Sequence, residues 1–461
     1  MDADSRSARR GWAYETFGDL SVGSRARTTR VVSMATALAA RPAGAVTEVF
    51  DTSAEREGAY RLLANDAVSS KSLGEAVFVS GVARCAKEKR VFVPVDGSSL
   101  TLTDKCHARD IGGVGAWAVG ARGLIVQTAL AVAGDGTTIG LVGQSWWART
   151  GRSEATSSSK TDQTETRHGL QVIRRVRERF IEDGSGVEPI FLLDRGYDCW
   201  PILRLGVEGF QFTVRAEYSR RLADGPRGEK RYLIDELERS PARGEYSLEL
   251  PARPDRPARV ARMRVRAKPV TVILKVGAKR RETVKLNAVL ATEVRGPKTG
   301  SLRWMLLTTS PIDTLEQVID VVDGYTYRWR IEEFHRTWKS GGCNVEDTQL
   351  RSREAIQKWA TIHAAVAARA VRLAQLARTR PDLPATEEFT QPEIDAAILL
   401  KKGRTKYKRG SQPPLGDMVR IVTDLGGYTG QSSGGPPGPT VVARGLERVA
   451  VAAEILEMLG R

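Results

Sequence analysis

Two short apolar runs, far apart in the chain, each end on an aspartate. KRVFVPVD (89–96) ends on Asp96, and EPIFLLD (188–194) ends on Asp194. Apolar runs of this length, rich in Val, Ile, Leu and Phe, predict buried strands. We therefore expect both carboxylates at the ends of neighbouring buried strands, where the sheet holds short side chains at fixed positions.

The segments around these runs predict a sheet with helices packed on it. Helical periodicity follows at 168–183, about 313–340 and about 353–378, and a polar stretch at 149–167 predicts an internal loop. The further strand-like runs are 124–132 and 137–147, which should pair antiparallel with 89–96, and then 210–216 and 303–309. The pattern predicts an α/β fold.

Residues 217–300 differ from the rest in charge and in strand pattern. Strand-like alternation recurs in EYSLELP, ARVARMRVRA, VTVILKVG and LNAVLATEV. Over 215–300, Lys and Arg outnumber Asp and Glu by 22 to 11. A basic β-rich insertion is suited to follow a phosphate backbone, although a solubilising β-subdomain without a ligand would have the same composition.

Four residues in DGYTYRWRIEEFHRTWKSGG (323–342) form a charged stripe. On an α-helix, Arg328, Glu332 and Lys339 lie at about 300°, 340° and 320° from Tyr325, within a stripe roughly 60° wide. A solvated helix face with an Arg328–Glu332 ion pair is one explanation. The other is a carboxylate that binds a metal ion, flanked by cations that bind phosphates.

Composition limits the partners and the compartment. The chain has 461 residues, a formal charge of +16 and a pI of about 9.8, which favours a polyanionic partner, nucleic acid first. No secretory signal or 18-residue apolar run is present, so we expect a cytoplasmic protein without a membrane span. The four scattered cysteines, including Cys106 beside His107, lack zinc-ligand spacing and are typical of a reducing compartment.

Asp96, Asp194 and Glu332 together have the chemistry of a divalent-metal site. Carboxylate oxygens are hard ligands that select Mg²⁺ or Mn²⁺. Two such ions a few ångströms apart can activate an attacking hydroxyl and stabilise the leaving oxygen of a phosphoryl transfer. We therefore predict two Mg²⁺ or Mn²⁺ ions per active site.

Both ends of the chain are predicted to be helical. Residues 1–70 form a small helical module whose clustered arginines, Arg25, Arg27 and Arg30, are candidates for DNA contact or for an ordinary exposed helix start. The apolar spacing at 441–459 predicts a last helix that packs on the body of the protein or on a second protomer.

These pieces together resemble the bacterial insertion-sequence transposases of the DDE class, in the branch that excises its element through a DNA hairpin. The matching segments include SRARTTR, EGAYRLLAN, VPVDGSSL, LLDRGYD, FTVRAE and RWMLLTTSP. The most specific is YTYRWRIEEFHRTWKSG, which carries the family's Tyr-x2-Arg-x3-Glu-x6-Lys signature in full.

The resemblance implies a ribonuclease H-like catalytic core, a mixed sheet with flanking helices, interrupted by a β-strand insertion. It also implies double-stranded DNA as partner, both the inverted-repeat ends of the element and target DNA, and a homodimer in the synaptic complex. The implied domains are an end-recognition domain (1–70), the first part of the core (71–216), the insertion (217–300), the second part of the core (301–378) and a helical dimerisation region (379–461).

The resemblance also implies roles for single residues. Asp96, Asp194 and Glu332 correspond to the metal-binding catalytic triad. The implied DNA contacts are Tyr325, Arg328 and Lys339 at phosphates, Trp304 at a base that leaves the stack, and Arg215, Arg336 and Tyr246. Two positions depart from the family pattern: Gly97 stands where relatives often have a hydroxyl residue, and Gly196 where some have an acidic one.

Three other functions remain open from the sequence. The first is a metal-dependent DNA endonuclease of the same fold that cuts without strand transfer. The second is a DNA-binding protein derived from a transposase that has lost catalysis. A glycosidase that uses paired carboxylates is a more distant idea, because the charge of +16 and the lack of aromatic-rich sugar platforms disfavour it.

Overall fold

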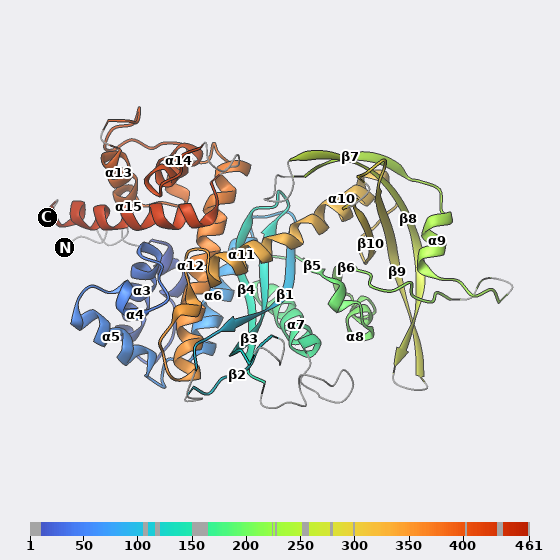
Figure 1. Cartoon of the computed structure of the whole chain (residues 1–461), viewed down its shortest axis with the longest axis horizontal. Helices are drawn as coiled ribbons and strands as arrows, with labels where there is room; N and C mark the ends of the chain where they lie inside the picture. Colours follow the sequence, from blue (N-terminus) through green and yellow to red (C-terminus); the bar gives the residue numbers. More distant parts are fainter. Residues whose placement is uncertain are drawn as a thin grey trace.

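The computed structural model describes residues 11–104, 109–115, 120–149, 165–223, 225, 228–250, 258–276, 280–297, 300–401, 403–430 and 437–459. Cys106, His107 and most of the predicted loop at 149–167 lie outside these ranges. Figure 1 shows a large sheet flanked by helices, with α3 (Arg25–Ala40) and α15 (Pro439–Leu459) in a helical region on one side. No helix among the described residues is long and apolar enough to cross a membrane.

The described strands form one mixed sheet of ten strands in the order β2-β3-β1-β5-β6-β10-β9-β8-β7, with β4 paired to β3. The predicted antiparallel trio is confirmed, and β5 and β6 add parallel to β1. The core strands are β1 (Val91–Thr101), β2 (Gly112–Gly113), β3 (Arg122–Ala133), β4 (Thr138–Trp147), β5 (Pro189–Leu193), β6 (Gln211–Arg215) and β10 (Arg303–Thr308).

Alternate residues of β1 face two different helical layers. Val93 and Val95 pack in one core cluster with α7, whereas Phe92 and Leu100 pack in another with α11 and α12. Asp96 therefore shares the face that α11 covers. The helices of these layers are α6 (Ser70–Cys85), α7 (Glu165–Asp183), α8 (Trp200–Leu203), α11 (Arg330–Lys339) and α12 (Arg353–Thr379). Helix α10 (Leu315–Thr326) packs in a separate core cluster. The predicted mixed sheet with flanking helices is confirmed.

Strand β1 does not end at Asp96, so this part of the prediction was wrong. It continues to Thr101, and residues 96–101 pair with β3. The apolar run ends at Asp96 because only the preceding residues are enclosed on both faces, while the backbone pairing extends beyond it.

The helix expected over about 313–340 is interrupted. Helix α10 ends at Thr326, the 3₁₀ turn η5 occupies Tyr327–Trp329, and α11 begins at Arg330. A 3₁₀ turn has three residues per turn rather than 3.6, so the angles expected for one continuous helix do not apply across it.

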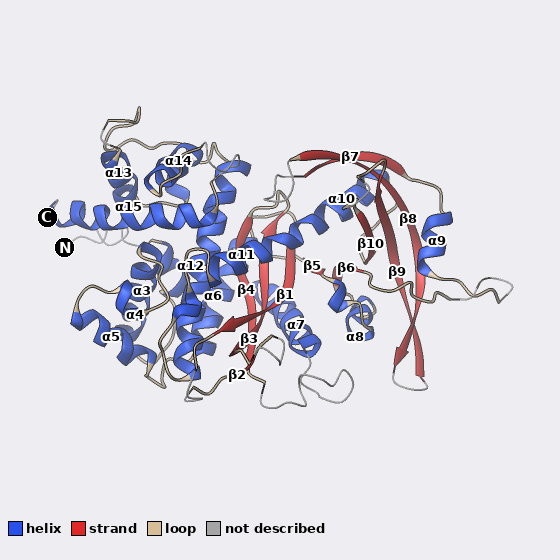
Figure 2. Cartoon of the chain, in the orientation of Figure 1, coloured by secondary structure: helices blue, strands red, loops and turns tan. Residues whose placement is uncertain are grey.

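The strands of the predicted insertion (217–300) continue the core sheet. Strand β9 pairs with β10, and β8 and β7 follow outward. In Figure 2 these strands extend away from the helical end of the molecule. The two runs expected at 258–277 form one long strand that passes through Pro269. The elements are α9 (Leu233–Arg239), β7 (Gly244–Leu250), β8 (Arg259–Val276) and β9 (Arg280–Glu293).

Helix α12 ties the N-terminal helices to the core. Its Lys358 Nζ donates hydrogen bonds to the carbonyl oxygens of Leu63 (2.9 Å) and Asn65 (3.0 Å), and Trp359 Nε1 donates to the Gly44 oxygen (2.7 Å). The terminal helices are α2 (Trp12–Phe17), α3 (Arg25–Ala40), α4 (Val46–Val49), α5 (Ser53–Leu63), α13 (Gln391–Leu400), α14 (Leu415–Leu425) and α15 (Pro439–Leu459).

Candidate active site

Asp96 and Asp194 are neighbours in the register of the sheet. The parallel pairing of β1 with β5 ends at Val95 and Leu193, so each aspartate is the next residue along its own strand. Strand β4 runs in the same direction as β1, and helix α7 then carries the chain back across the sheet. Strand β5 can therefore pair parallel with β1. Two carboxylates that are 98 positions apart in sequence are thus placed side by side by backbone pairing.

Backbone amides hold each of these carboxylates. Asp194 Oδ1 accepts the N–H of Gly196 at 2.9 Å and so caps the 3₁₀ turn η3 (Arg195–Tyr197). Asp96 Oδ1 accepts the N–H of Gly97 at 2.8 Å. These bonds fix part of each side chain's orientation.

The electrostatic environment of Asp96 is unfavourable for its charge. Burial, followed by the negative charge of Asp194, raises the pKa of Asp96 to about 6 from an ordinary 3.8, although Arg328 opposes the shift. Glu332 adds a smaller effect in the same direction. The three carboxylates therefore interact with one another, and a cation placed among them would relieve the repulsion.

Arg328 links Glu332 to the aspartates. Its Nη2 donates to Glu332 Oε1 at 2.6 Å, and its Nη1 lies 3.8 Å from Asp96 Oδ2. The Arg328 side chain is only 12% exposed. The ion pair that a solvated helix face would have is thus present, but it lies in a largely buried position against β1.

The donor set suits a divalent cation in its chemistry. No group of three or more Asp, Glu, His or Cys side chains in the described part of the chain is arranged as a ready metal site. However, Asp96, Asp194 and Glu332 offer the hard oxygen ligands that Mg²⁺ and Mn²⁺ prefer, and burial together with the negative charge of Asp194 raises the pKa of Asp96, which a bound cation would oppose. The residues therefore fit such an ion.

Trp304 and Arg215 both lie near Tyr325, which interacts electrostatically with Asp194. The ring of Trp304 meets that of Tyr325 edge-on, with centroids 6.3 Å apart. Burial raises the pKa of Tyr325 to about 12, and the positive charges of Arg328 and Arg215 partly offset this. Arg215, at the end of β6, donates from Nη2 to the carbonyl oxygen of Arg303 at 3.2 Å.

Lys339, at the end of α11, is held by a glutamate that the sequence did not single out. Its Nζ lies 3.5 Å from Glu346 Oε1, and the same oxygen accepts the N–H of Thr101 at 2.7 Å. Glu346 therefore ties Lys339 to the end of β1. Arg336, one turn before Lys339, is exposed. Glu346 lies in a stretch without a recognisable motif, so no sequence signal marked it.

Comparison with known protein families gives three matches along the chain. Residues 149–368 match the model of the transposase DDE domain, and residues 9–68 match the model of the transposase DNA-binding domain. Residues 365–458 match the model of the Tn5 transposase dimerisation domain. The chain belongs to the Tn5-like DDE transposases.

Membership of this family explains the architecture. The mixed sheet with flanking helices is the ribonuclease H-like DDE core, and the two other matches imply DNA binding and homodimerisation. DDE transposases perform phosphoryl transfer and generally use divalent ions. Asp96 precedes the matched DDE range, so its place beside Asp194 comes from the sheet register alone.

The other predicted DNA contacts of this transposase are Tyr246 on β7 and three arginines of α3. Tyr246 packs against α10, where burial and the charge of Asp323 raise the pKa of its hydroxyl. The three arginines of α3 lie in the DNA-binding domain, on the other side of α12 from the sheet (Figure 1). Arg25 and Arg30 are exposed, and Arg27 donates to the Val22 oxygen at 3.0 Å.

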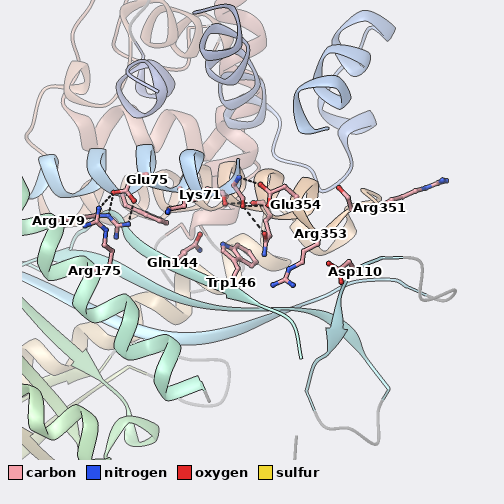
Figure 3. A pocket seen from close by; sticks show the side chains of 16 residues that line it. Lys71, Glu75, Asp110, Gln144, Trp146, Arg175, Arg179, Arg351, Arg353 and Glu354 are labelled. Carbon is pink, nitrogen blue, oxygen red and sulfur yellow. Dashed lines mark hydrogen bonds and ion pairs between the residues drawn. The ribbon is translucent and has the colours of Figure 1, made fainter. Parts of the chain in front are cut away.

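A cavity of about 1110 Å³ lies apart from these residues, between α6, β4, α7 and the start of α12 (Figure 3). Several of its charged groups are already paired: Arg179 Nη2 donates to Glu75 Oε2 at 2.6 Å, and Glu354 accepts from the Ser70 hydroxyl at 3.0 Å. None of the predicted site residues lines it. We assign it no part in the active site.

The raised pKa of Asp96 predicts a pH-dependent stability in the absence of divalent ions. Because the folded-state pKa exceeds the unfolded one, ionisation of Asp96 destabilises the fold increasingly as pH rises from about 4 to about 6. Asp96→Asn should therefore raise the free energy of unfolding by about 1–3 kcal/mol at pH 7.5, and by almost nothing near pH 4. Urea denaturation at both pH values measures this.

The exposed carboxylate of Asp313 provides a control for this prediction. Asp313→Asn should change the free energy of unfolding by less than about 0.5 kcal/mol at either pH. An Asp96→Asn variant that is equally or less stable than wild type at pH 7.5 would contradict a destabilising ionisation of Asp96 by its burial and by the charge of Asp194.

Proposed function

We propose that this chain is a catalytically competent DNA transposase that excises its insertion sequence and joins the 3′ ends to target DNA. Asp96, Asp194 and Glu332 would hold two Mg²⁺ or Mn²⁺ ions. The main support is the register that sets the two aspartates side by side, with Glu332 tied to Asp96 through Arg328. When bound, the ions supply activation of the attacking hydroxyl and stabilisation of the leaving oxygen.

The positions of the neighbouring residues suggest how DNA would be held. Arg328, Tyr325 and Lys339 would contact phosphates beside the scissile bond. Arg328 is the residue best placed to change partners, because it now neutralises Glu332 and Asp96. A phosphate would take over this guanidinium through charge-assisted hydrogen bonds, which are among the strongest that proteins make.

The proposed reaction runs in four steps. Water attacks the phosphorus at the element's end, which breaks the P–O3′ bond and leaves a 3′-hydroxyl. That hydroxyl attacks the phosphodiester of the opposite strand, which breaks its P–O3′ bond to the flanking DNA, releases the flank with a 3′-hydroxyl and leaves a hairpin on the element end. Water reopens the hairpin, and the restored 3′-hydroxyl attacks a phosphodiester of target DNA. Trp304, whose ring lies against Tyr325, would stack on the base that leaves the helix when the hairpin bends the terminal duplex.

The basic insertion and the dimerisation domain provide the remaining parts of this proposal. Strands β7, β8 and β9 would follow the DNA backbone beside the active site. A homodimer would bring two element ends together, each cut by the protomer bound to the other. Because each phosphate contact releases counterions from the DNA, the affinity for DNA should fall steeply as the salt concentration rises.

The test uses the full chain, a duplex carrying the inverted-repeat end of its element, and Mg²⁺. We expect nicked and hairpin products, and pre-cut ends should join to a supercoiled plasmid. Chelation by EDTA should stop all steps. Cutting without joining would favour the endonuclease alternative, whereas binding without cutting in either Mg²⁺ or Mn²⁺ would favour a DNA-binding protein that has lost catalysis.

A further inference from the structure

A buried polar pair lies behind the two aspartates, on the sheet face that α7 covers. The hydroxyl of Tyr197 donates to Gln127 Oε1 at 2.8 Å. Gln127 is 2% exposed and Tyr197 is 6% exposed. Burying an amide and a phenol in an apolar layer costs free energy unless the two groups satisfy each other, so this contact holds both side chains in place.

Gln127 acts on the strand that carries Asp96. It is the partner of Gly97 in the pairing of β1 with β3, and Gly97 follows Asp96 directly. A Cβ atom on residue 97 would stand 2.8 Å from Gln127 Nε2, closer than side chains normally approach. The glycine at this position therefore makes room for the amide of Gln127 against the backbone beside Asp96.

Tyr197 acts on the turn that carries Asp194. Its N–H donates to the Asp194 carbonyl oxygen at 3.2 Å, so Tyr197 closes the turn that the Asp194 side chain caps. Helix α7 presses on the tyrosine ring at Gly169, where a Cβ would come within 2.5 Å of it. Asp198, the next residue, is fixed by Arg220 Nε at 2.6 Å.

Gln127 and Tyr197 thus connect the two aspartate-bearing segments from the opposite face of the sheet. Alternation along β1 directs Asp96 towards α11 and the residue after it towards α7. The hydrogen bond between Gln127 and Tyr197 therefore spans from β3 to η3 without touching the space in front of the carboxylates.

We propose that Gln127 and Tyr197 are positioning residues that set the spacing of Asp96 and Asp194 and thereby the affinity for divalent ions. This inference rests on the proposed function. It also explains two residues of the sequence together, because Gly97 leaves room for the Gln127 side chain and Tyr197 donates a hydrogen bond to it. Groups that orient metal ligands without binding the metal typically alter metal affinity or activity 10- to 100-fold.

The experiment titrates the full chain, bound to its element-end duplex, with Mn²⁺, and follows free Mn²⁺ by electron paramagnetic resonance. Tyr197→Phe, which deletes only the hydroxyl, should weaken Mn²⁺ binding about tenfold or more. The Mn²⁺ concentration for half-maximal nicking should rise by the same factor, while nicking at saturating Mn²⁺ should fall less. Gln127→Met should behave alike, and the double variant should be no worse than the weaker-binding single variant.

The matched control is Thr213→Val, which removes a buried hydroxyl contact with Thr308 (2.9 Å) in the same sheet. It should lower the unfolding temperature without changing Mn²⁺ affinity. Equal Mn²⁺ affinity in wild type and Tyr197→Phe, or an equal loss in Thr213→Val, would overturn the positioning role alone. A wild-type complex that neither binds Mn²⁺ nor cuts DNA would instead overturn the proposed function.

Discussion

Replacing Glu332 with glutamine is expected to reduce strand nicking by at least about a thousandfold, with little change in DNA affinity. A factor of this size corresponds to about 4 kcal/mol of activation free energy. The reason is that an amide lacks the negative charge needed to bind a divalent ion, while its shape keeps α11 packed as it is. Single-turnover nicking with excess protein measures the rate, and gel-shift titration measures DNA affinity.

Glu333 is the control for this substitution, because it is the adjacent glutamate on α11 but has other partners. Its Oε2 lies 3.3 Å from Arg330 Nη1 and accepts from Gln375 Nε2 at 2.9 Å. Glu333→Gln should nick DNA within about threefold of wild type. If Glu332→Gln retained nicking, or if Glu333→Gln lost it equally, Glu332 would not be the third metal ligand.

The positions of Asp96 and Asp194 could be anticipated from sequence because their strands are enclosed on both faces. Such strands read as continuous apolar runs, and the first polar residue marks where the enclosure ends. The end of strand β1 could not be anticipated in this way. Residues 97–101 remain in the sheet through backbone hydrogen bonds to β3, which do not depend on side-chain polarity.

The stripe of Tyr325, Arg328, Glu332 and Lys339 was predicted on one continuous helix, and this part of the prediction was wrong. The 3₁₀ turn η5 separates Tyr325 from Glu332. Tyr325, on α10, is buried in a core cluster against which the partly buried Trp304 packs. Helical periodicity in a sequence is averaged over several turns. A 3₁₀ turn of three residues therefore cannot be predicted from it.

The supporting residues could not be read from the sequence at all. Gln127 lies in an apolar run that reads simply as a buried strand, and Tyr197 lies in a short turn. Their meeting depends on the register between β1, β3 and β5, which a single sequence does not specify. Long-range pairing of this kind becomes visible only in three dimensions.

Charge substitutions on α15 are expected to weaken the dimer strongly and, with it, the complex of two paired element ends. Four exposed apolar residues follow helical spacing on this helix: Val451, Ile455, Met458 and Leu459, which are 43%, 52%, 71% and 79% exposed. The helix lies within the range matched by the Tn5 transposase dimerisation domain, except for its last residue. We therefore expect this stripe to pack against a second copy of the chain.

The variant Ile455→Glu/Leu459→Glu should weaken dimerisation by at least about a hundredfold. Each buried Ile or Leu contributes about 1.5–3 kcal/mol, and a two-fold interface contains every substitution twice. Light scattering during size-exclusion chromatography of the complex with DNA measures the mass, and gel shift separates single-end from paired-end complexes. Binding of one end should persist, because the N-terminal domain is unchanged.

Ile181 on α7 tests whether any exposed apolar residue would give the same result. It is 68% exposed and lies outside the matched dimerisation range. Ile181→Glu should form paired-end complexes as wild type does, since this residue lies outside the matched dimerisation range. Paired-end complexes of normal affinity in the α15 variant would exclude the stripe as the dimer contact, and loss of these complexes in Ile181→Glu would place the contact on α7 instead.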